Sequence, residues 1–225
     1  EDTLSLHDAL PILITYLKKW IQVFLPKEKP QAEIKITPRE VNEVASASKF
    51  NIVTFAGDAI VNAANQQLAP GCGVCGHIFA ASDFDALEQA CAEQAPCPTG
   101  SARITPSFGL NAPWIIHAVG PIYDASNQER CAQQLHDAYY ETLTLAEKHQ
   151  IKSIAFPAIS TGIYGYPLND ATNIAVEAVR KFVIDHPETK LKVHFSCFDD
   201  KTYDCYQTYL NNAAPVVKQQ ELQYV

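Results

Sequence analysis

Two glycine-rich segments could bind a ligand through their backbone N–H groups. The first is APGCGVCG, residues 69–76, and the second is STGIYGY, residues 160–166. Glycine has no Cβ, so the backbone can approach a ligand closely, and a helix that follows adds the positive end of its dipole. Two such segments side by side would suit a pyrophosphate group.

Each glycine-rich segment alone is a weak signal. GCGVCG does not match the GxGxxG dinucleotide fingerprint with its acidic ribose ligand, and STGIYG lacks the lysine of a P-loop. Tight turns that need glycine would explain either segment by itself. Because both follow predicted strands, together they favour a phosphate-bearing ligand.

The elements that must position these segments alternate along the chain. Apolar runs predict strands at Asn51–Phe55, Ala59–Ala64, Trp114–Val119, Ser153–Ile159 and Leu191–Phe198, and more weakly at Ser101–Phe108. Helical periodicity predicts helices at 79–94, 132–149, 170–184 and 202–212. This alternation predicts an α/β fold with a largely parallel sheet covered on both faces. Ligands bind beyond the carboxyl ends of the strands in such sheets, where both glycine-rich segments fall.

Four cysteines raise the alternative of a metal site: Cys72, Cys75, Cys91 and Cys97. A structural zinc site prefers two close pairs, whereas the second pair here is widely spaced and Cys91 lies in a helical pattern. We therefore expect no metal, and no redox role for the CxxC pair. The other three cysteines are expected to be small buried hydrophobes: Cys131, Cys197 and Cys205.

Six segments resemble the macrodomain family, in the right order and over roughly residues 50–212. They are DAIVNAAN (58–65), GCGVCG (71–76), PTGSARIT (98–105), WIIHAVGP (114–121), SIAFPAISTGIYGYP (153–167) and VHFSCFDDKTYDCY (193–206). The resemblance implies a three-layer α/β/α sandwich with a mixed, largely parallel sheet that binds ADP-ribose. Many members hydrolyse ADP-ribosyl esters, either mono-ADP-ribosyl-Asp/Glu on proteins or O-acetyl-ADP-ribose. A non-catalytic reader of ADP-ribosylated proteins is the alternative.

The resemblance also implies roles for particular residues. Asn65 would bind the distal ribose and help to place the attacking water. The first glycine-rich segment would wrap the distal ribose and the nearer phosphate through Gly71, Gly73, Val74 and Gly76. The second would donate backbone amides to the pyrophosphate, with its tyrosine closing over it, through Ser160, Thr161, Gly162, Ile163 and Tyr164. Phe198 would pack on the adenine, beside Asn51 and Ile52.

Two positions depart from the family pattern. Asn51 stands where the family usually has an Asp that reads the adenine amino group, and an uncharged acceptor makes a weaker bond. Cys75 stands where hydrolytic members commonly have an Asp that orients water. Cysteine is also found there in alphaviral macrodomains, whose loop has a proline before the glycines, as Pro70 does here, and that group resembles active hydrolases. Cys75 thus weakens the case for catalysis without removing it.

Two histidines and a pair of acidic residues complete the candidates. His77 begins the helix after the first glycine-rich segment and is a minor candidate for a general base, because it has no acidic partner nearby in sequence. His117 lies in a strand among apolar neighbours, so we expect it to be buried and hydrogen-bonded. Asp199 and Asp200 precede a predicted helix, and N-capping explains at least one of them.

The composition limits the partners. The chain has 225 residues, a net charge of -8 and a pI of about 5.3, so it lacks the basic surface that a phosphate-neutralising nucleic-acid binder needs. Its seven cysteines are an odd number, which favours free thiols over a disulfide framework. The apolar run at 9–17 is too short to span a membrane. We expect a cytoplasmic monomer whose partner is ADP-ribose or an ADP-ribosylated protein, without nucleic acid, membrane or cofactor.

The chain divides into three parts by composition. Residues 1–45 form an N-terminal extension, with a predicted short helix at 10–25 and a linker of prolines and lysines at 26–30. The first dozen residues resemble translated sequencing-adapter text and carry no functional weight. Residues 46–214 are the predicted macrodomain, and residues 215–225 are a C-terminal tail.

Overall fold

The structure is a computed structural model that describes residues 41–213. The predicted N-terminal helix, the linker and the C-terminal tail lie outside the described residues. The elements in chain order are η1 (Val41–Glu43), β1 (Ala45–Lys49), η2 (Ile52–Thr54), β2 (Ala59–Ala63), α2 (Val74–Ala81), α3 (Phe84–Gln94), β3 (Ala102–Pro106), β4 (Trp114–Ala118), α4 (Gln128–Lys148), β5 (Ser153–Phe156), α5 (Leu168–Asp185), β6 (Lys192–Cys197) and α6 (Asp200–Asn212).

The six strands form one mixed sheet in the order β1-β6-β5-β2-β4-β3. Neighbouring strands are parallel except β3, which runs antiparallel to β4. This confirms the predicted α/β class and the largely parallel sheet. The strands β2 and β5 are direct neighbours, and they are the two strands that precede the glycine-rich segments.

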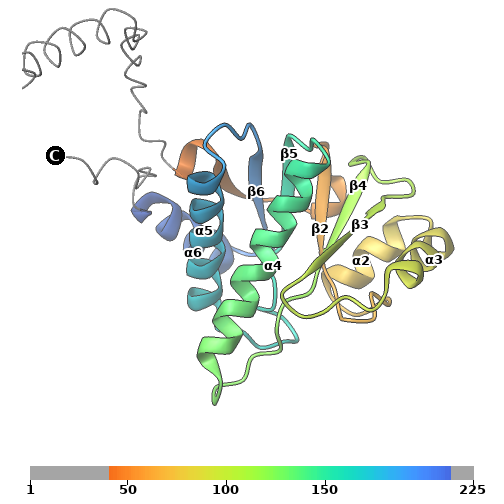
Figure 1. The fold of residues 1–225 in the computed structure, drawn as a ribbon, viewed down its shortest axis with the longest axis horizontal. Coiled ribbons are helices and arrows are strands. Elements are labelled where there is room, and N and C mark those ends of the chain that lie inside the picture. Colours follow the sequence, from red (N-terminus) through yellow and green to blue (C-terminus); the bar gives the residue numbers. More distant parts are fainter. Residues whose placement is uncertain (1–40, 214–225) are drawn as a thin grey trace, which may run out of the picture. The chain divides into compact units, whose positions relative to one another are not determined.

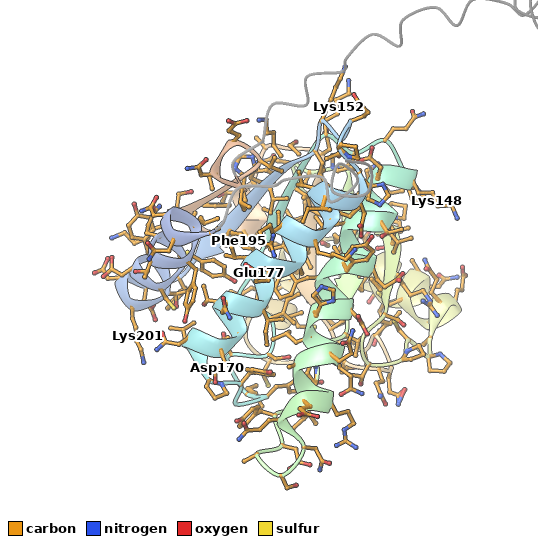
Figure 2. All side chains as sticks on the ribbon, turned by 60° about the vertical axis from the view of Figure 1, so that its left-hand side comes forward. Lys148, Lys152, Asp170, Glu177, Phe195 and Lys201 are labelled. Carbon is orange, nitrogen blue, oxygen red and sulfur yellow. The ribbon has the colours of Figure 1, made fainter. Side chains whose placement is uncertain are left out.

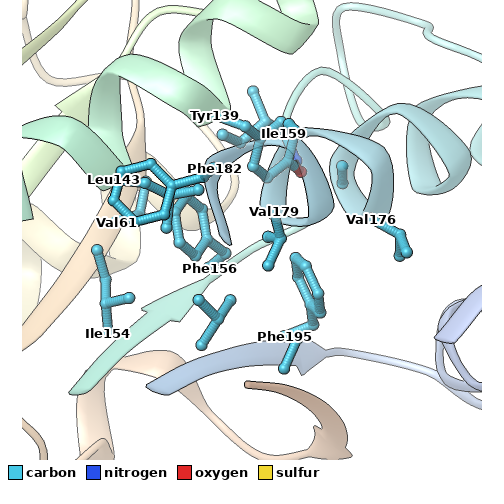
Figure 3. Packing of buried hydrophobic residues seen from close by; sticks show 14 of the residues in the cluster. Val61, Tyr139, Leu143, Ile154, Phe156, Ile159, Val176, Val179, Phe182 and Phe195 are labelled. Atoms are coloured by element: carbon cyan, nitrogen blue, oxygen red, sulfur yellow. The ribbon is translucent and has the colours of Figure 1, made fainter. Parts of the chain in front are cut away.

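Helices cover both faces of the sheet, as the periodicity predicts (Figure 1). One face packs against α4, α5 and α6, and the other against α2 and α3. On the first face, Phe156 of β5 and Phe195 of β6 lie beneath Val179 and Phe182 of α5, all of them almost completely buried (Figure 3). The result is the three-layer α/β/α sandwich that the family resemblance implies.

The two ends of the sandwich are chemically different. Asp170 and Lys201 mark the N-terminal ends of α5 and α6, whereas Lys148 and Lys152 lie at the opposite end, where α4 finishes and β5 starts (Figure 2). The carboxyl ends of the parallel strands therefore share one end of the molecule with the helix N-termini. That end is where ligands bind in α/β sheets.

The predicted strand at 51–55 is wrong, because this segment contains the 3-10 helix η2. Asn51 caps it: the side-chain Oδ1 accepts a hydrogen bond from the Val53 N–H at 3.3 Å. The Thr54 hydroxyl donates to the Asn51 carbonyl at 2.7 Å. Such local side-chain bonds offer the backbone an alternative to a sheet ladder, and they win here.

The predicted helix at 79–94 is also corrected, because the structure has two helices, α2 and α3. The Ser82 hydroxyl donates back to the Ile78 carbonyl at 2.9 Å, and Asp83 then caps α3 by accepting from the Ala86 N–H at 3.3 Å. Serine and aspartate favour helix ends over helix interiors for this reason.

The edge strand β1 was not predicted from the sequence. Its sequence, ASASK, has little apolar periodicity, and it pairs only with β6. Its first residue, Ala45, and the preceding Val41 and Val44 are buried in the core with α4, α5 and α6. The compact fold thus includes residues just before position 46.

Candidate functional site

The two glycine-rich segments emerge side by side at the carboxyl ends of β2 and β5. They are also close enough to interact. The pKa of the Tyr164 phenol is raised, first by burial and second by the nearby Cys75 thiol. Both segments lie at the carboxyl ends of strands, as predicted, and these two strands are neighbours in the sheet. We call residues 65–73 the β2 loop and residues 157–166 the β5 loop.

The β5 loop turns sharply and leaves backbone donors unpaired. Ser160 has a φ of 66°, and its carbonyl accepts from the Tyr166 N–H at 2.9 Å. The Gly165 N–H donates to the Gly162 carbonyl at 2.9 Å. Among residues 41–213, no hydrogen-bond acceptor is found for four N–H groups in the stretch 160–166, those of Ser160, Gly162, Ile163 and Tyr164. The Thr161 N–H, in contrast, donates to the Ala158 carbonyl at 3.4 Å.

The β2 loop ends at the start of α2. Gly73 is the N-cap with a φ of 63°, which a side chain rarely tolerates, and Val74 begins the helix. A Cβ at Gly76 would lie 2.5 Å from the Gly71 carbonyl oxygen, so the loop folds tightly over the first turn of the helix. The first-turn N–H groups of a helix lack intrahelical partners and attract anions.

Asn65 organises the β2 loop with its own side chain. Its Oδ1 accepts from the N–H groups of Gln67 at 3.0 Å and Ala69 at 3.2 Å, and its Nδ2 donates to the Ala69 carbonyl at 2.9 Å. The carboxamide therefore has both acceptor positions occupied, while the second hydrogen of its Nδ2 is available. That hydrogen is the part of Asn65 that could reach a sugar hydroxyl.

Cys75 lies beneath the β2 loop with 4% of its surface exposed. Its Sγ is 3.6 Å from Asn62 Nδ2 and 3.8 Å from the Ala69 carbonyl oxygen. Burial raises the pKa of the Cys75 thiol, although the hydrogen bond from Asn62 opposes this. Cys75 is therefore a protonated, weakly nucleophilic thiol at neutral pH.

His117 is completely buried and hydrogen-bonded, as predicted. Its Nε2 is 2.9 Å from the Thr105 hydroxyl, and its Nδ1 is 3.1 Å from Asn62 Nδ2. Burial lowers the pKa of His117 to about 4, so the ring is neutral at pH 7. Asn62, which joins His117 to Cys75, was not identified from the sequence, because it lies inside an apolar strand and its partner is distant along the chain.

The other polar candidates occupy the rim. His77 is exposed, and its Nδ1 lies 2.9 Å from the Gly73 carbonyl oxygen at the start of the same helix. Asp199 caps α6 by accepting from the Thr202 N–H at 2.7 Å, as predicted. Asp200 forms an exposed ion pair with Lys49 at 2.5 Å.

The predicted adenine end combines the ends of β1 and β6, which pair in the sheet. Phe198 directly follows β6 and is 99% exposed, an unusual state for a phenylalanine. Asn51 follows β1 and is exposed, while Ile52 beside it is buried in the core. Ile163 of the β5 loop is 78% exposed. Exposed apolar surface at the end of a sheet suits a flat aromatic ligand.

All seven cysteines are free. In the described part of the chain, no three or more His, Cys, Asp or Glu side chains are grouped so that they could hold a metal ion. None of the helices between residues 41 and 213 is long and apolar enough to cross a membrane. Cys131, Cys197 and Cys205 are buried, as predicted.

Comparison with known proteins agrees with this architecture. The Macro domain family model matches residues 61–175, and the chain belongs to the macrodomain family. An O-acetyl-ADP-ribose deacetylase of Citrobacter rodentium is 44% identical over 164 residues, which cover 71% of this chain and 91% of that protein. An ADP-ribose glycohydrolase of Xenopus laevis is 38% identical over 208 residues, which cover 92% of this chain and 49% of that protein.

A solved structure has the same fold. The macrodomain of Oceanobacillus iheyensis, determined with ADP, superimposes with a TM-score of 0.71 at 32% identity. The superposition covers 78% of this chain and 94% of the other.

Proposed function

We propose that this macrodomain binds ADP-ribose and hydrolyses ADP-ribosyl esters, either mono-ADP-ribosyl-Asp/Glu on proteins or O-acetyl-ADP-ribose. The observation that supports this most is the set of four N–H groups without acceptors between Ser160 and Tyr164, at the carboxyl end of a central strand. Such groups bind phosphate oxygens without a basic side chain, which suits a chain of net charge -8.

Three groups of residues set the orientation of the ligand. The pyrophosphate lies on the β5 loop, between Gly162 and the first turn of α2. The adenosine extends toward Phe198 and Asn51, where an exposed ring can pack on the base. The distal ribose lies at the β2 loop, within reach of Asn65. The relative solved with ADP supports the adenosine diphosphate part of this assignment.

The reaction is an attack of water on the ester, which breaks the ester C–O bond and releases ADP-ribose and the free carboxylic acid. The Cys75 thiol is buried and has a raised pKa, which makes it a poor nucleophile. A water held between the distal ribose and a ligand phosphate can be deprotonated by that phosphate. Asn65 fixes the ribose, and good positioning alone can supply several kcal/mol. The names of the two hydrolytic relatives support an enzymatic role.

A non-catalytic reader is the second candidate, and two observations favour it. Position 75 is occupied by a cysteine and therefore has no carboxylate to orient water. Most of the hydrogen-bonding capacity of Asn65 is used within the β2 loop. Both would weaken catalysis while leaving the pyrophosphate site intact.

One experiment separates the two functions. The protein is incubated with an auto-mono-ADP-ribosylated substrate, and loss of the label is followed together with ADP-ribose binding by calorimetry. We expect micromolar binding and loss of label. Binding without loss from this substrate or from O-acetyl-ADP-ribose would establish the reader, and absence of binding would contradict both functions.

We further propose that the protein acts as a cytoplasmic monomer and that residues 1–45 contribute no side chain to the ligand site. The free state of all seven cysteines supports a reducing compartment.

A further inference from the structure

Tyr139 lies at the centre of α4, yet its hydroxyl reaches the base of the β5 loop. The side chain is completely buried, and its ring packs against that of Phe156 with centroids 5.3 Å apart. Figure 3 shows Tyr139 next to Ile159, the residue before Ser160. No part of Tyr139 can touch a ligand, so any effect on binding must pass through the loop.

The hydroxyl of Tyr139 contacts the backbone on both sides of Ala158. It accepts a hydrogen bond from the Ile159 N–H at 3.1 Å and lies 3.4 Å from the Pro157 carbonyl oxygen. It is also 3.4 Å from the Tyr206 hydroxyl, which approaches from α6. One arrangement satisfies all these groups: Tyr139 donates to Pro157, and Tyr206 donates to Tyr139. Burial raises the pKa of Tyr139 to about 12, so the phenol keeps this proton.

The backbone needs this phenol because the sheet no longer supports it there. The register of β5 with β6 ends at Phe156 opposite Phe195, so the next residues have no strand partner on that side. A buried N–H or carbonyl without a partner costs free energy, and the side chain of a neighbouring helix supplies the bonds. The chain then enters the left-handed conformation at Ser160.

We propose that Tyr139 is a positioning residue for the pyrophosphate. Its hydroxyl fixes residues 157–159 and thereby sets the direction of the unpaired N–H groups that begin at Ser160. This inference rests on the proposed function, since it assigns the β5 loop to the pyrophosphate. Tyr206 shares the same buried pair of hydroxyls but has no bond to the loop, so it provides a matched control.

The test uses two ligands and three variants: Tyr139→Phe, Tyr206→Phe and the double variant. ADP-ribose and adenosine affinities are measured for each by calorimetry or NMR titration, alongside unfolding in urea. We expect Tyr139→Phe to weaken ADP-ribose binding about tenfold, because the released loop no longer holds its N–H groups toward the phosphates, while leaving adenosine binding unchanged. Tyr206→Phe should bind both ligands like the wild type. The double variant should behave like Tyr139→Phe.

Several results would overturn the inference. If Tyr139→Phe binds ADP-ribose as the wild type does, or weakens both ligands alike, the hydroxyl has only a structural role. If Tyr139→Phe does not fold, the double variant is used instead, because it leaves no tyrosine hydroxyl without a partner. Its affinities for ADP-ribose and adenosine are compared with those of the wild type in the same way. Failure of the wild type to bind ADP-ribose is a separate result, which would refute the proposed function itself.

Discussion

Gly120 and Ser160 touch across the end of β2: a Cβ at position 120 would lie 2.3 Å from the Ser160 hydroxyl oxygen. It would also lie 2.5 Å from Cγ2 of Ile159. The segments that follow β4 and β5 therefore pack together over the strand that separates them in the sheet. The Ser160 hydroxyl is buried there and has no hydrogen-bond partner among residues 41–213. The backbone at Gly120 thus packs directly against the β5 loop.

Gly120→Ala should displace the β5 loop. Overpacking of this kind typically costs about 1–3 kcal/mol, and we expect both lower stability in urea and weaker ADP-ribose binding. Adding Ser160→Gly removes the nearer clash and should restore part of the lost stability and part of the lost affinity. Wild-type affinity in Gly120→Ala would show that the loop adapts freely.

Gly162→Val should weaken binding without the loss of stability expected for Gly120→Ala. A Cβ at Gly162 meets nothing within 4 Å, so the side chain enters open space on the side where we place the pyrophosphate. We expect unchanged stability and at least a tenfold loss of ADP-ribose affinity, about 1.4 kcal/mol, with Gly162→Ala intermediate. Calorimetry showing full affinity in Gly162→Val would remove the β5 loop from the site.

Asn51→Asp should sharpen adenine recognition without changing stability. Aspartate caps as well as asparagine does, so η2 should be preserved. A carboxylate accepts a stronger hydrogen bond from the exocyclic amine of adenine. We therefore expect tighter ADP-ribose binding and a larger ratio of the affinity for ADP-ribose to that for IDP-ribose. An unchanged ratio would mean that Asn51 does not contact the base.

Asn65 and Cys75 should differ sharply in single-turnover hydrolysis. Cys75→Ala should retain most activity because the buried thiol does not attack the ester. Asn65→Ala should lose one to several powers of ten in rate, about 1.4 kcal/mol for each. Asn65→Asp is the matched variant, since it keeps the acceptor for the Gln67 and Ala69 N–H groups but loses the donor hydrogens. Each variant must first be shown to bind ADP-ribose. An inactive Cys75→Ala together with a covalent adduct on Cys75 would contradict the water mechanism.

His117 should make the protein less stable as the pH falls from 6.5 toward 4. The pKa of His117 is about 4 in the folded protein and about 6.5 in the unfolded chain, so only the unfolded chain binds the proton in this range. The loss should be of the order of 3 kcal/mol at the acid end. Urea unfolding at several pH values should show that the free energy of unfolding changes less steeply with pH in His117→Gln than in the wild type. His194, whose pKa is lowered by burial and then by Lys192, contributes in the same direction, so the difference between the two proteins is the relevant quantity. Equal slopes would contradict the buried neutral state.

The class of fold and the two glycine-rich loops could be predicted from local sequence patterns. Strand and helix periodicity are local properties, and they gave five of the six strands and the helical layers. Glycine-rich turns can likewise be predicted from the sequence, because the effect of glycine on the backbone does not depend on distant residues. Where local bonds compete with the periodic pattern, as at Asn51 and Ser82, the sequence prediction was wrong.

The contacts that support the loops could not be predicted, because they join residues that are distant along the chain. Tyr139 and Ile159 are 20 positions apart, and Asn62 and His117 are 55 apart, yet each pair is hydrogen-bonded in the core. Nothing in the types of these residues marks them, since a tyrosine on an apolar helix face and an asparagine in a buried strand fit ordinary packing. Their partners are set by which strands lie next to each other and which helix crosses them. These contacts depend on the order β1-β6-β5-β2-β4-β3, which no local pattern encodes.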